Sequence, residues 1–296
     1  MSGSSVLYDA QGPRARRRNV VYTVVFGLAL AALVWWVYRS LSDKGQLDWE
    51  KWKPFFSGSE AWTTYILPGL KNTLIAAALS MLIALPLGAL FGIARLSDHV
   101  WVRVPATVIV EFFRAIPVLI LMIFGNALFS EYTSVSSDDR PLYAVVTGLV
   151  LYNSSVLAEI VRAGILALPK GQTEAAQAIG LRKTQIMTSI LLPQAVTAML
   201  PAIVSQLVVI VKDTALGGAI LTFPELLAAV SPMSSYYGAN TIASFTIVAV
   251  IFVLLNFGLT SFASWLERRL RRRKKSTGAV LAPAAVGGAE STGATV

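Results

Sequence analysis

Charged residues inside long apolar stretches are the side chains of this chain that could do chemistry. Lys212 and Asp213 are adjacent within the apolar stretch 194–216, and Thr214 follows them. Neighbouring residues on a helix point about 100° apart, so Lys and Asp suit two different partners rather than each other. A cation beside an anion complements a zwitterion such as an amino acid, so we expect these residues to line a substrate path, with Thr214 as a hydroxyl donor. A lysine near a helix end that extends its amine to the membrane surface is the structural alternative.

Two further charged pairs share one spacing. Glu111 and Arg114 lie three residues apart in one apolar stretch, and Glu159 and Arg162 repeat this spacing in the next. Residues three apart face the same side of a helix, so each pair can form locally. An ionised side chain in the middle of a membrane helix costs about 2.5–3.5 kcal/mol on insertion scales, so each one needs a partner. We therefore expect these four residues to form structural intramembrane ion pairs between helices.

Several kinds of catalytic site are excluded by the residues that the sequence lacks. It has no cysteine and a single histidine, His99, so thiol nucleophiles, cysteine-ligated metals, multi-histidine metal sites and a Ser-His-Asp triad cannot form. No G-x-x-x-x-G-K-[ST] phosphate-binding loop is present. We expect no catalytic residue, no metal and no cofactor in this chain.

The elements that position these residues are membrane helices. Of 296 residues, 55% are hydrophobic and only 14% are charged, whereas soluble domains have about 25% charged residues. A membrane-spanning helix needs about 20 mostly apolar residues. We predict an all-α polytopic membrane protein with six transmembrane helices, near residues 20–38, 66–94, 104–129, 141–166, 194–216 and 240–264. Pro86, Pro117 and Pro201 are expected to break the second, third and fifth of these helices.

The basic residues predict the orientation of the chain. With the N-terminus inside, sixteen of the 25 Lys and Arg residues lie in inner segments and five in outer ones, as the positive-inside rule requires. Both termini are then cytoplasmic. We expect the basic residues behind the net charge of +9 to bind anionic lipid headgroups rather than a nucleic acid. Helix 20–38 follows a basic run but has no clear cleavage site, so we interpret it as a retained anchor rather than a signal peptide.

The inner connection 167–193 is the longest of the inner connections. Helix formers at 174–179 are followed by Gly180, and 182–192 can resume a helix, which predicts two short helices around a glycine turn. A side chain at the glycine would clash or strain the turn. An ordinary surface hairpin is the simplest interpretation. The segment also carries a specific set of spaced residues: Glu174, Ala175, Ala176, Gly180, Ile190, Leu192 and Pro193.

These seven positions resemble the EAA signature of ABC-importer permeases. The E-x-x-R-x-x-P stretch from Glu111 and the A-E-x-x-R-x-G stretch around Glu159 are similar to those of the histidine/glutamine-type polar amino-acid permeases. The resemblance covers about 70–267 and is strongest to actinobacterial glutamate-uptake permeases. Ala115 and Ile116 stand where Gly-Thr is common in that family, and Ala215 stands where Ser is common.

The resemblance implies the type I ABC-importer permease fold and a translocation subunit that is not an enzyme. In that family the EAA hairpin is a coupling helix seated in a separate ATPase, which binds the ATP and Mg²⁺. By resemblance, Glu174 is a polar anchor, Ala175 and Ala176 form a close-contact surface, and Gly180 is the turn residue. The implied partners are a homologous permease subunit in a heterodimer, two ATPase subunits and an extracytoplasmic amino-acid-binding protein, in the bacterial cytoplasmic membrane.

The predicted organisation has five parts. They are a disordered cytoplasmic arm, an extra transmembrane helix, an extracytoplasmic segment, the permease domain with its coupling hairpin at 167–193, and a basic and then disordered cytoplasmic tail, at residues 1–19, 20–38, 39–65, 66–267 and 268–296.

The resemblance makes L-glutamate the expected substrate, with glutamine, aspartate and basic amino acids as alternatives. An ion-gradient-driven transporter is the alternative mechanism, although such proteins usually show internal repeats, and here only the E-x-x-R spacing recurs. A membrane enzyme or a scaffolding subunit is the third class. The missing catalytic residues disfavour the enzyme, and a scaffold has no need of Lys212 and Asp213.

Overall fold

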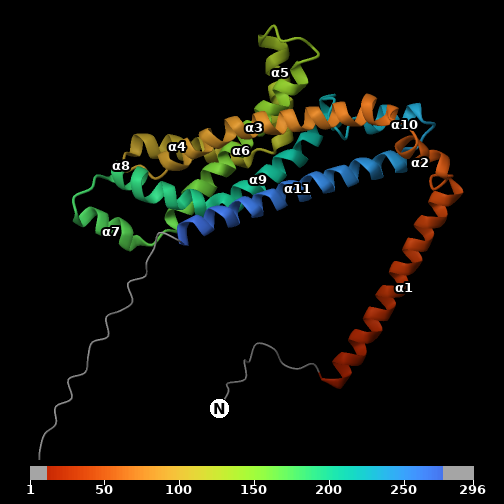
Figure 1. The fold of residues 1–296 in the computed structure, drawn as a ribbon, viewed down its shortest axis with the longest axis horizontal. Coiled ribbons are helices and arrows are strands. Elements are labelled where there is room, and N and C mark those ends of the chain that lie inside the picture. The colour runs from red at the N-terminus through yellow and green to blue at the C-terminus, as the bar shows by residue number, and fades with distance from the viewer. Residues whose placement is uncertain (1–11, 276–296) are drawn as a thin grey trace, which may run out of the picture. The chain divides into compact units, whose positions relative to one another are not determined.

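The computed structural model describes residues 12–275, and every regular element in that range is helical (Figure 1). The predicted all-α class is therefore confirmed. The main helices are α1 (Pro13–Asp43), α2 (Trp49–Phe56), α3 (Leu67–Ala94), α4 (Val100–Ala115), α5 (Val118–Tyr132), α6 (Arg140–Leu166), α7 (Lys170–Ala178), α8 (Lys183–Ile186), α9 (Leu192–Ile220), α10 (Val230–Tyr236) and α11 (Thr241–Lys275). Our expectations of disorder at residues 1–11 and 276–296 lie outside the described residues.

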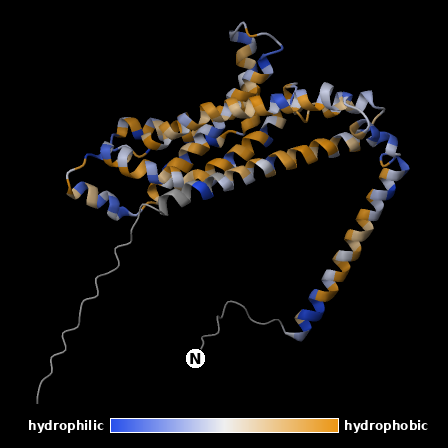
Figure 2. Cartoon of the chain, in the orientation of Figure 1, coloured by the Kyte–Doolittle hydropathy of each residue, from blue (hydrophilic) through white to orange (hydrophobic). Residues whose placement is uncertain are grey.

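The described helices give five membrane spans, and the predicted sixth depends on how one bent helix pair is counted. Five segments are long and apolar enough to cross a membrane, and a sixth span results if the bent pair α4 and α5 is taken as one. Figure 2 shows polar residues at both ends of α1 and apolar residues between them. α1 begins at Pro13, so residues 13–19, which we expected in the disordered arm, belong to this helix.

Only one of the three predicted proline breaks occurs. α4 and α5 meet at an angle of 100°, and Ile116, which precedes Pro117, is extended, with φ −89° and ψ 129°. The proline ring disfavours a helical conformation for the residue before it, which explains this break. The prediction was wrong for Pro86 and Pro201, because both lie inside continuous helices. Other groups can satisfy the carbonyls that a proline leaves free within a membrane helix.

The chain forms two compact units, which we describe separately. The first comprises Met1–Asn72 and Pro224–Ile251, and the second comprises Thr73–Phe223 and Phe252–Val296. In the first unit, the segment after α1 binds the connection between α10 and α11. The Gln46 amide donates to Ala239 O (3.0 Å), the Lys51 amine donates to Gly238 O, and the Asn240 amide donates to Lys51 O (3.1 Å).

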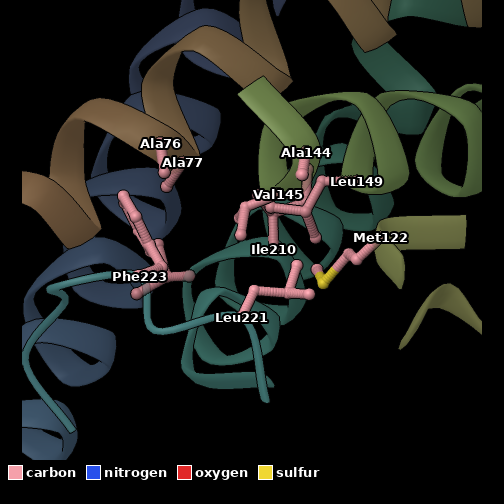
Figure 3. Close-up of a cluster of buried hydrophobic side chains, with 10 residues drawn as sticks. Ala76, Ala77, Met122, Ala144, Val145, Leu149, Ile210, Leu221 and Phe223 are labelled. Carbon is pink, nitrogen blue, oxygen red and sulfur yellow. The ribbon is translucent and has the colours of Figure 1, made fainter. Parts of the chain in front are cut away.

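The second unit is built around α6. Leu149 and Val145 of α6 are completely buried against Met122 of α5 and Ile210 of α9, as Figure 3 shows. Buried residues recur along the whole of α6, from Pro141 to Ile165. A helix with buried residues on several sides lies in the interior of its unit.

Glycines allow α3 to approach α6 closely. Gly88 and Gly92 are four residues apart, the spacing of the small-residue motif that packs membrane helices. A Cβ on Gly88 would lie 2.5 Å from Leu157 Cβ, and one on Gly92 would lie 2.7 Å from Ala158 O. Both distances are too short for real contacts, so only glycine fits at these two positions. This motif was readable in the sequence, but our predictions did not use it.

Candidate coupling and transport site

The inner connection folds as a helical hairpin, and its turn is set by a glycine. α7 ends at Ala178, and Gly180 follows with φ +80°. The Leu181 amide donates to Ala176 O (3.1 Å) and the Gly180 amide to Gln177 O (2.9 Å), which is the Schellman arrangement. The predicted glycine turn is confirmed. We expected a side chain at Gly180 to clash or to strain the turn, and the structure supports strain: φ is positive, whereas no atom lies within 4 Å of a Cβ built there.

The second arm of the hairpin continues into the membrane-length helix α9. The short helix α8 leads through a π-helical turn at Met187–Leu191 directly into Leu192. Ile186 and Leu191 are buried with Val161 and Ile165 of α6, and Ile190 and Leu192 pack against the same cluster. The hairpin is therefore joined both to the end of α6 and to the start of α9 by an apolar core.

Polar contacts hold the hairpin at two further points. The Lys183 amine donates to the Asp98 carboxylate and to Leu96 O, in the connection between α3 and α4. This hydrogen bond to Lys183 lowers the pKa of Asp98 below its ordinary value. The Gln194 amide donates to the Gln172 side chain (2.8 Å), which links α9 to α7.

The outer surface of the hairpin differs from the expected one at Ala176 and at Ile179. Glu174, Ala175 and Ile179 are exposed, Ile179 by 77%. Ala176 is only 4% exposed and lies in the core of this chain, so it offers no contact surface to a partner, contrary to our expectation. It belongs to the same buried cluster as Val161 and Ile165 of α6. Ile179 was missed, although an isoleucine directly before the turn glycine in a mostly polar helix was a usable signal.

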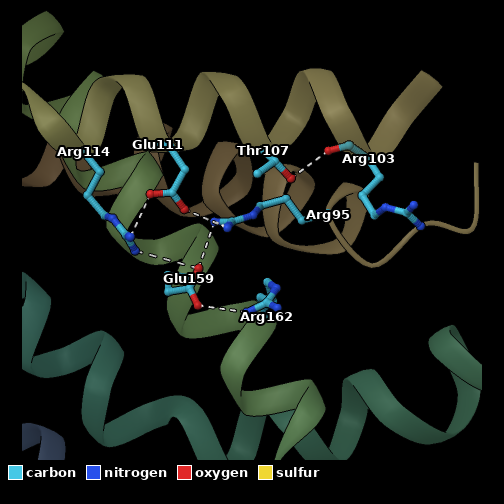
Figure 4. Close-up of polar contacts among 7 residues, drawn as sticks. All are labelled: Arg95, Arg103, Thr107, Glu111, Arg114, Glu159 and Arg162. Carbon is cyan, nitrogen blue, oxygen red and sulfur yellow. Dashed lines mark hydrogen bonds and ion pairs between the residues drawn. The ribbon is translucent and has the colours of Figure 1, made fainter. Parts of the chain in front are cut away.

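The four predicted ion-pair residues form one network. Glu111 accepts from Arg114 (2.8 Å) and Glu159 accepts from Arg162 (3.1 Å), as the spacing predicted. The two pairs are joined by Arg95, whose two terminal nitrogens lie 2.8 Å from Glu111 and 2.8 Å from Glu159 (Figure 4). Arg95 thereby links the end of α3 to α4 and α6.

The central position of Arg95 was not predicted. Its side chain is only 8% exposed, far less than those of the two glutamates. In the sequence it was only one of the basic residues at the inner end of a span. The usable signal was its place directly after the last residue of the apolar stretch 66–94, where a charge lies close to the ends of neighbouring helices.

The three residues of the expected substrate path differ in exposure. Lys212 is exposed, Asp213 is partly buried and Thr214 is completely buried. The Thr214 hydroxyl donates to Val211 O (2.7 Å) in its own helix. This geometry contradicts a role for Thr214 as a donor to substrate and leaves Lys212 and Asp213 as the candidate groups.

A protein family matches most of the chain. Residues 84–272 match the family described as "Binding-protein-dependent transport system inner membrane component". The chain belongs to this family of ABC-importer permeases. The glutamate transport system permease protein GluD of Corynebacterium glutamicum is 50% identical to this permease over 231 residues, which is 78% of this chain and 84% of GluD. The probable glutamine permease GlnP of Bacillus subtilis is 30% identical over 213 residues, which is 71% of this chain and 96% of GlnP.

Solved structures agree with the family assignment. The crystal structure of an amino acid ABC transporter with histidines has a chain that matches this permease with a TM-score of 0.61 and 26% identity. The match covers 69% of this chain and 92% of that chain. The predicted type I importer permease fold and the resemblance to polar amino-acid permeases are both confirmed.

The assignment decides between the functional classes left open by the sequence. The permease is an inner-membrane, multi-pass component of a bacterial ABC importer, and it works with an ATPase and a binding protein. It is not itself catalytic, and nucleotide binding lies in the partner ATPase. A gradient-driven transporter, a membrane enzyme and a simple scaffold are therefore set aside.

Proposed function

We propose that this permease carries an acidic amino acid, glutamate, across the membrane. The observation that supports this most is the identity of half of 231 aligned residues with a glutamate permease. A second permease in the same comparison, BztC of Rhodobacter capsulatus, is described as transporting glutamate, glutamine, aspartate and asparagine, and is 31% identical over 206 residues. The alignment covers 69% of this chain but only 48% of BztC.

Lys212 and Asp213 are the proposed substrate contacts. Lys212 lies eight residues before the end of α9 at Ile220, which is about 12 Å at 1.5 Å per residue. An exposed amine this far inside a membrane-length helix is costly against lipid, so this face of α9 suits a polar path or a protein partner. On a path, Lys212 binds a substrate carboxylate and Asp213 binds the ammonium group.

The hairpin is the proposed coupling element. Glu174, Ala175 and Ile179 form the exposed surface that a cleft in an ATPase can receive. The buried residues Ile186 and Leu191 join that surface to α6 and α9. Closure of the ATPases is a rigid-body movement, and a rigidly rooted hairpin transmits it to the transmembrane helices.

The proposed assembly contains a second, related permease subunit and two ATPase subunits, with both termini of this chain in the cytoplasm. The distribution of basic residues supports this orientation.

Because the chain contains no cysteine, introduced cysteines test the orientation directly. In the proposed topology, a membrane-impermeant maleimide labels Ser137→Cys in intact cells and labels Ala175→Cys only after permeabilisation. The reverse pattern contradicts the orientation.

Transport in liposomes tests the proposed function. The importer is reconstituted with its binding protein and enclosed ATP, and uptake of glutamate, glutamine, aspartate and arginine is compared. The proposal expects glutamate uptake that requires ATP and persists when ion gradients are collapsed. ATP-dependent uptake of arginine but not of glutamate contradicts the substrate. A partner permease identical to this chain contradicts the heterodimer.

A further inference from the structure

A pocket beside the ion-pair network carries an excess of positive charge. It has a volume of about 360 Å³, which is in the range of small-ligand sites. It lies wholly within the second unit and is lined by Arg95, Arg103, Val104, Thr107, Val108 and Arg162. None of the roles proposed above uses this pocket.

The described carboxylates do not neutralise the arginines around it. Arg95, Arg103, Arg114 and Arg162 carry four positive charges around the pocket, and Glu111 and Glu159 carry two negative ones. Asp98, which Arg103 also attracts, is paired with Lys183, so two positive charges remain in excess. Arg103 forms no ion pair with any described residue, and its guanidinium donates to the backbone oxygen of Ser97 (3.2 Å). In Figure 4 its side chain extends away from both glutamates. The pocket therefore suits an anion.

The rim of the pocket is apolar and exposed. Val104 and Val108 lie one helical turn apart on α4 and are 49% and 61% exposed. Trp101, at the start of the same helix, is 91% exposed, and tryptophan favours the level of the lipid headgroups. A free phosphate would use only the arginines, whereas a phospholipid would use the valines as well, along its acyl chain.

We propose that this pocket binds the phosphate of an anionic phospholipid, such as phosphatidylglycerol, in the inner leaflet. Arg103 and Arg162 provide the charge-assisted hydrogen bonds, since a guanidinium fits phosphate oxygens with two donors at once. Basic pockets between helices on the cytoplasmic side of a membrane are suited to acidic headgroups. The choice of leaflet rests on the orientation in the proposed function, whereas binding of the phosphate itself does not.

Native mass spectrometry of the purified importer tests the proposal. Phosphatidylglycerol or phosphatidylcholine is added to the delipidated complex, and the lipid retained is counted with and without excess inorganic phosphate. Arg103→Gln is expected to lower phosphatidylglycerol retention about fivefold, and Arg103→Lys is expected to lower it less. Arg268→Gln, which removes an exposed charge at the inner end of α11 outside the pocket, is the matched control and is expected to retain lipid as the wild type does.

Each other outcome contradicts the proposal. Equal retention by Arg103→Gln and the wild type, or an equal loss in Arg268→Gln, contradicts a specific site. Displacement of the lipid by inorganic phosphate contradicts the lipid as the source of the anion. The readout requires no transport, so it stays valid if the substrate is not glutamate, and the maleimide experiment shows separately whether the leaflet is wrong.

Discussion

Lys212 is the residue whose replacement most directly tests the substrate path. Lys212→Met keeps the length of the side chain but removes the charge, and a hydrogen bond to a charged group contributes about 1.5–3 kcal/mol. We therefore expect ATP-dependent glutamate uptake to fall about 10–100-fold, measured as uptake divided by substrate concentration in liposomes. Lys212→Arg keeps the charge and is expected to retain most of the uptake. Normal uptake by Lys212→Met would instead support a lysine that only extends to the membrane surface.

Arg95 is expected to contribute to stability through both glutamates. Arg95→Met removes the most buried cation of the network, and Glu111 and Glu159 then keep only Arg114, which lies 2.8 Å and 3.8 Å from them, and Arg162 at Glu159. Breaking a buried ion pair costs about 3–5 kcal/mol. Because these glutamates are 46% and 33% exposed, we expect the free energy of unfolding to fall by a smaller amount, about 2–4 kcal/mol. Tryptophan fluorescence in detergent should show this as a lower Tm.

The exposed pair of Lys53 and Glu50 provides the control for this effect. Its side chains are 52% and 78% exposed, and pairs of this kind contribute about 0–1 kcal/mol. Lys53→Met should therefore leave the Tm almost unchanged. Equal Tm values for the Arg95→Met and Lys53→Met variants would show that the network around Arg95 does not stabilise the fold.

At the residue scale, the sequence predicted the ion pairs within each helix but not the contacts between helices. The spacing of Glu111–Arg114 and Glu159–Arg162 follows from helical geometry, so both pairs could be read locally. The link through Arg95 depends on how three helix ends meet, which no local pattern encodes. The burial of Ala176 and Thr214 likewise depends on which face of each helix meets its neighbour.

At the scale of the elements, the hairpin turn depends on the backbone of Gly180. An alanine in the left-handed region costs about 1–2 kcal/mol, although there is open space for its methyl group. We expect Gly180→Ala to reduce ATP-coupled uptake while the complex still assembles, and Gly180→Asn to be milder because asparagine tolerates positive φ. The readout is uptake per assembled complex.

Gly171 gives a matched control in the same hairpin. A Cβ there also meets nothing within 4 Å, and its φ is not positive, so Gly171→Ala should transport normally. If both alanine variants lose the same fraction of uptake, the conformation of the turn is not the cause.

The packing of α3 on α6 should be equally sensitive to a methyl group. Gly92→Ala places a Cβ 2.7 Å from Ala158 O and 2.8 Å from Val161 Cβ, and overpacking of this kind costs about 1–3 kcal/mol. We expect a lower Tm for this variant. Gly258→Ala in α11 meets no atom within 4 Å and should be neutral or slightly stabilising, since alanine favours helices. A Tm for Gly92→Ala at or above that of Gly258→Ala would contradict the close approach of the helices.

Helices and spans were predictable because apolar stretches of about 20 residues leave the backbone few other options in a membrane. The Pro117 break was predictable too, whereas the continuity of α3 and α9 through Pro86 and Pro201 was not. A proline changes the local hydrogen bonding, and the surrounding packing decides whether the helix axis bends. The continuous path from α8 into α9 through a π-helical turn at Met187–Leu191 was not predicted either.

At the scale of the whole molecule, the permease converts work done by another polypeptide into access for a solute. The chain has a hairpin that is anchored by a buried apolar cluster, and the exposed Lys212 and partly buried Asp213 lie on the helix that continues from it. In the proposed function neither feature acts alone, because the hairpin needs an ATPase to move it and the charges need a path formed with a second permease. The central claim is therefore that the hairpin contacts the ATPase.

Cross-linking from Ala175→Cys tests that claim most directly. The chain contains no other cysteine, so a short thiol-reactive cross-linker in the assembled importer reports the neighbours of this one position. We predict a product with the ATPase subunit whose yield changes when ATP is added. A product with the extracytoplasmic binding protein, or none with the ATPase while the complex remains intact, would contradict the account.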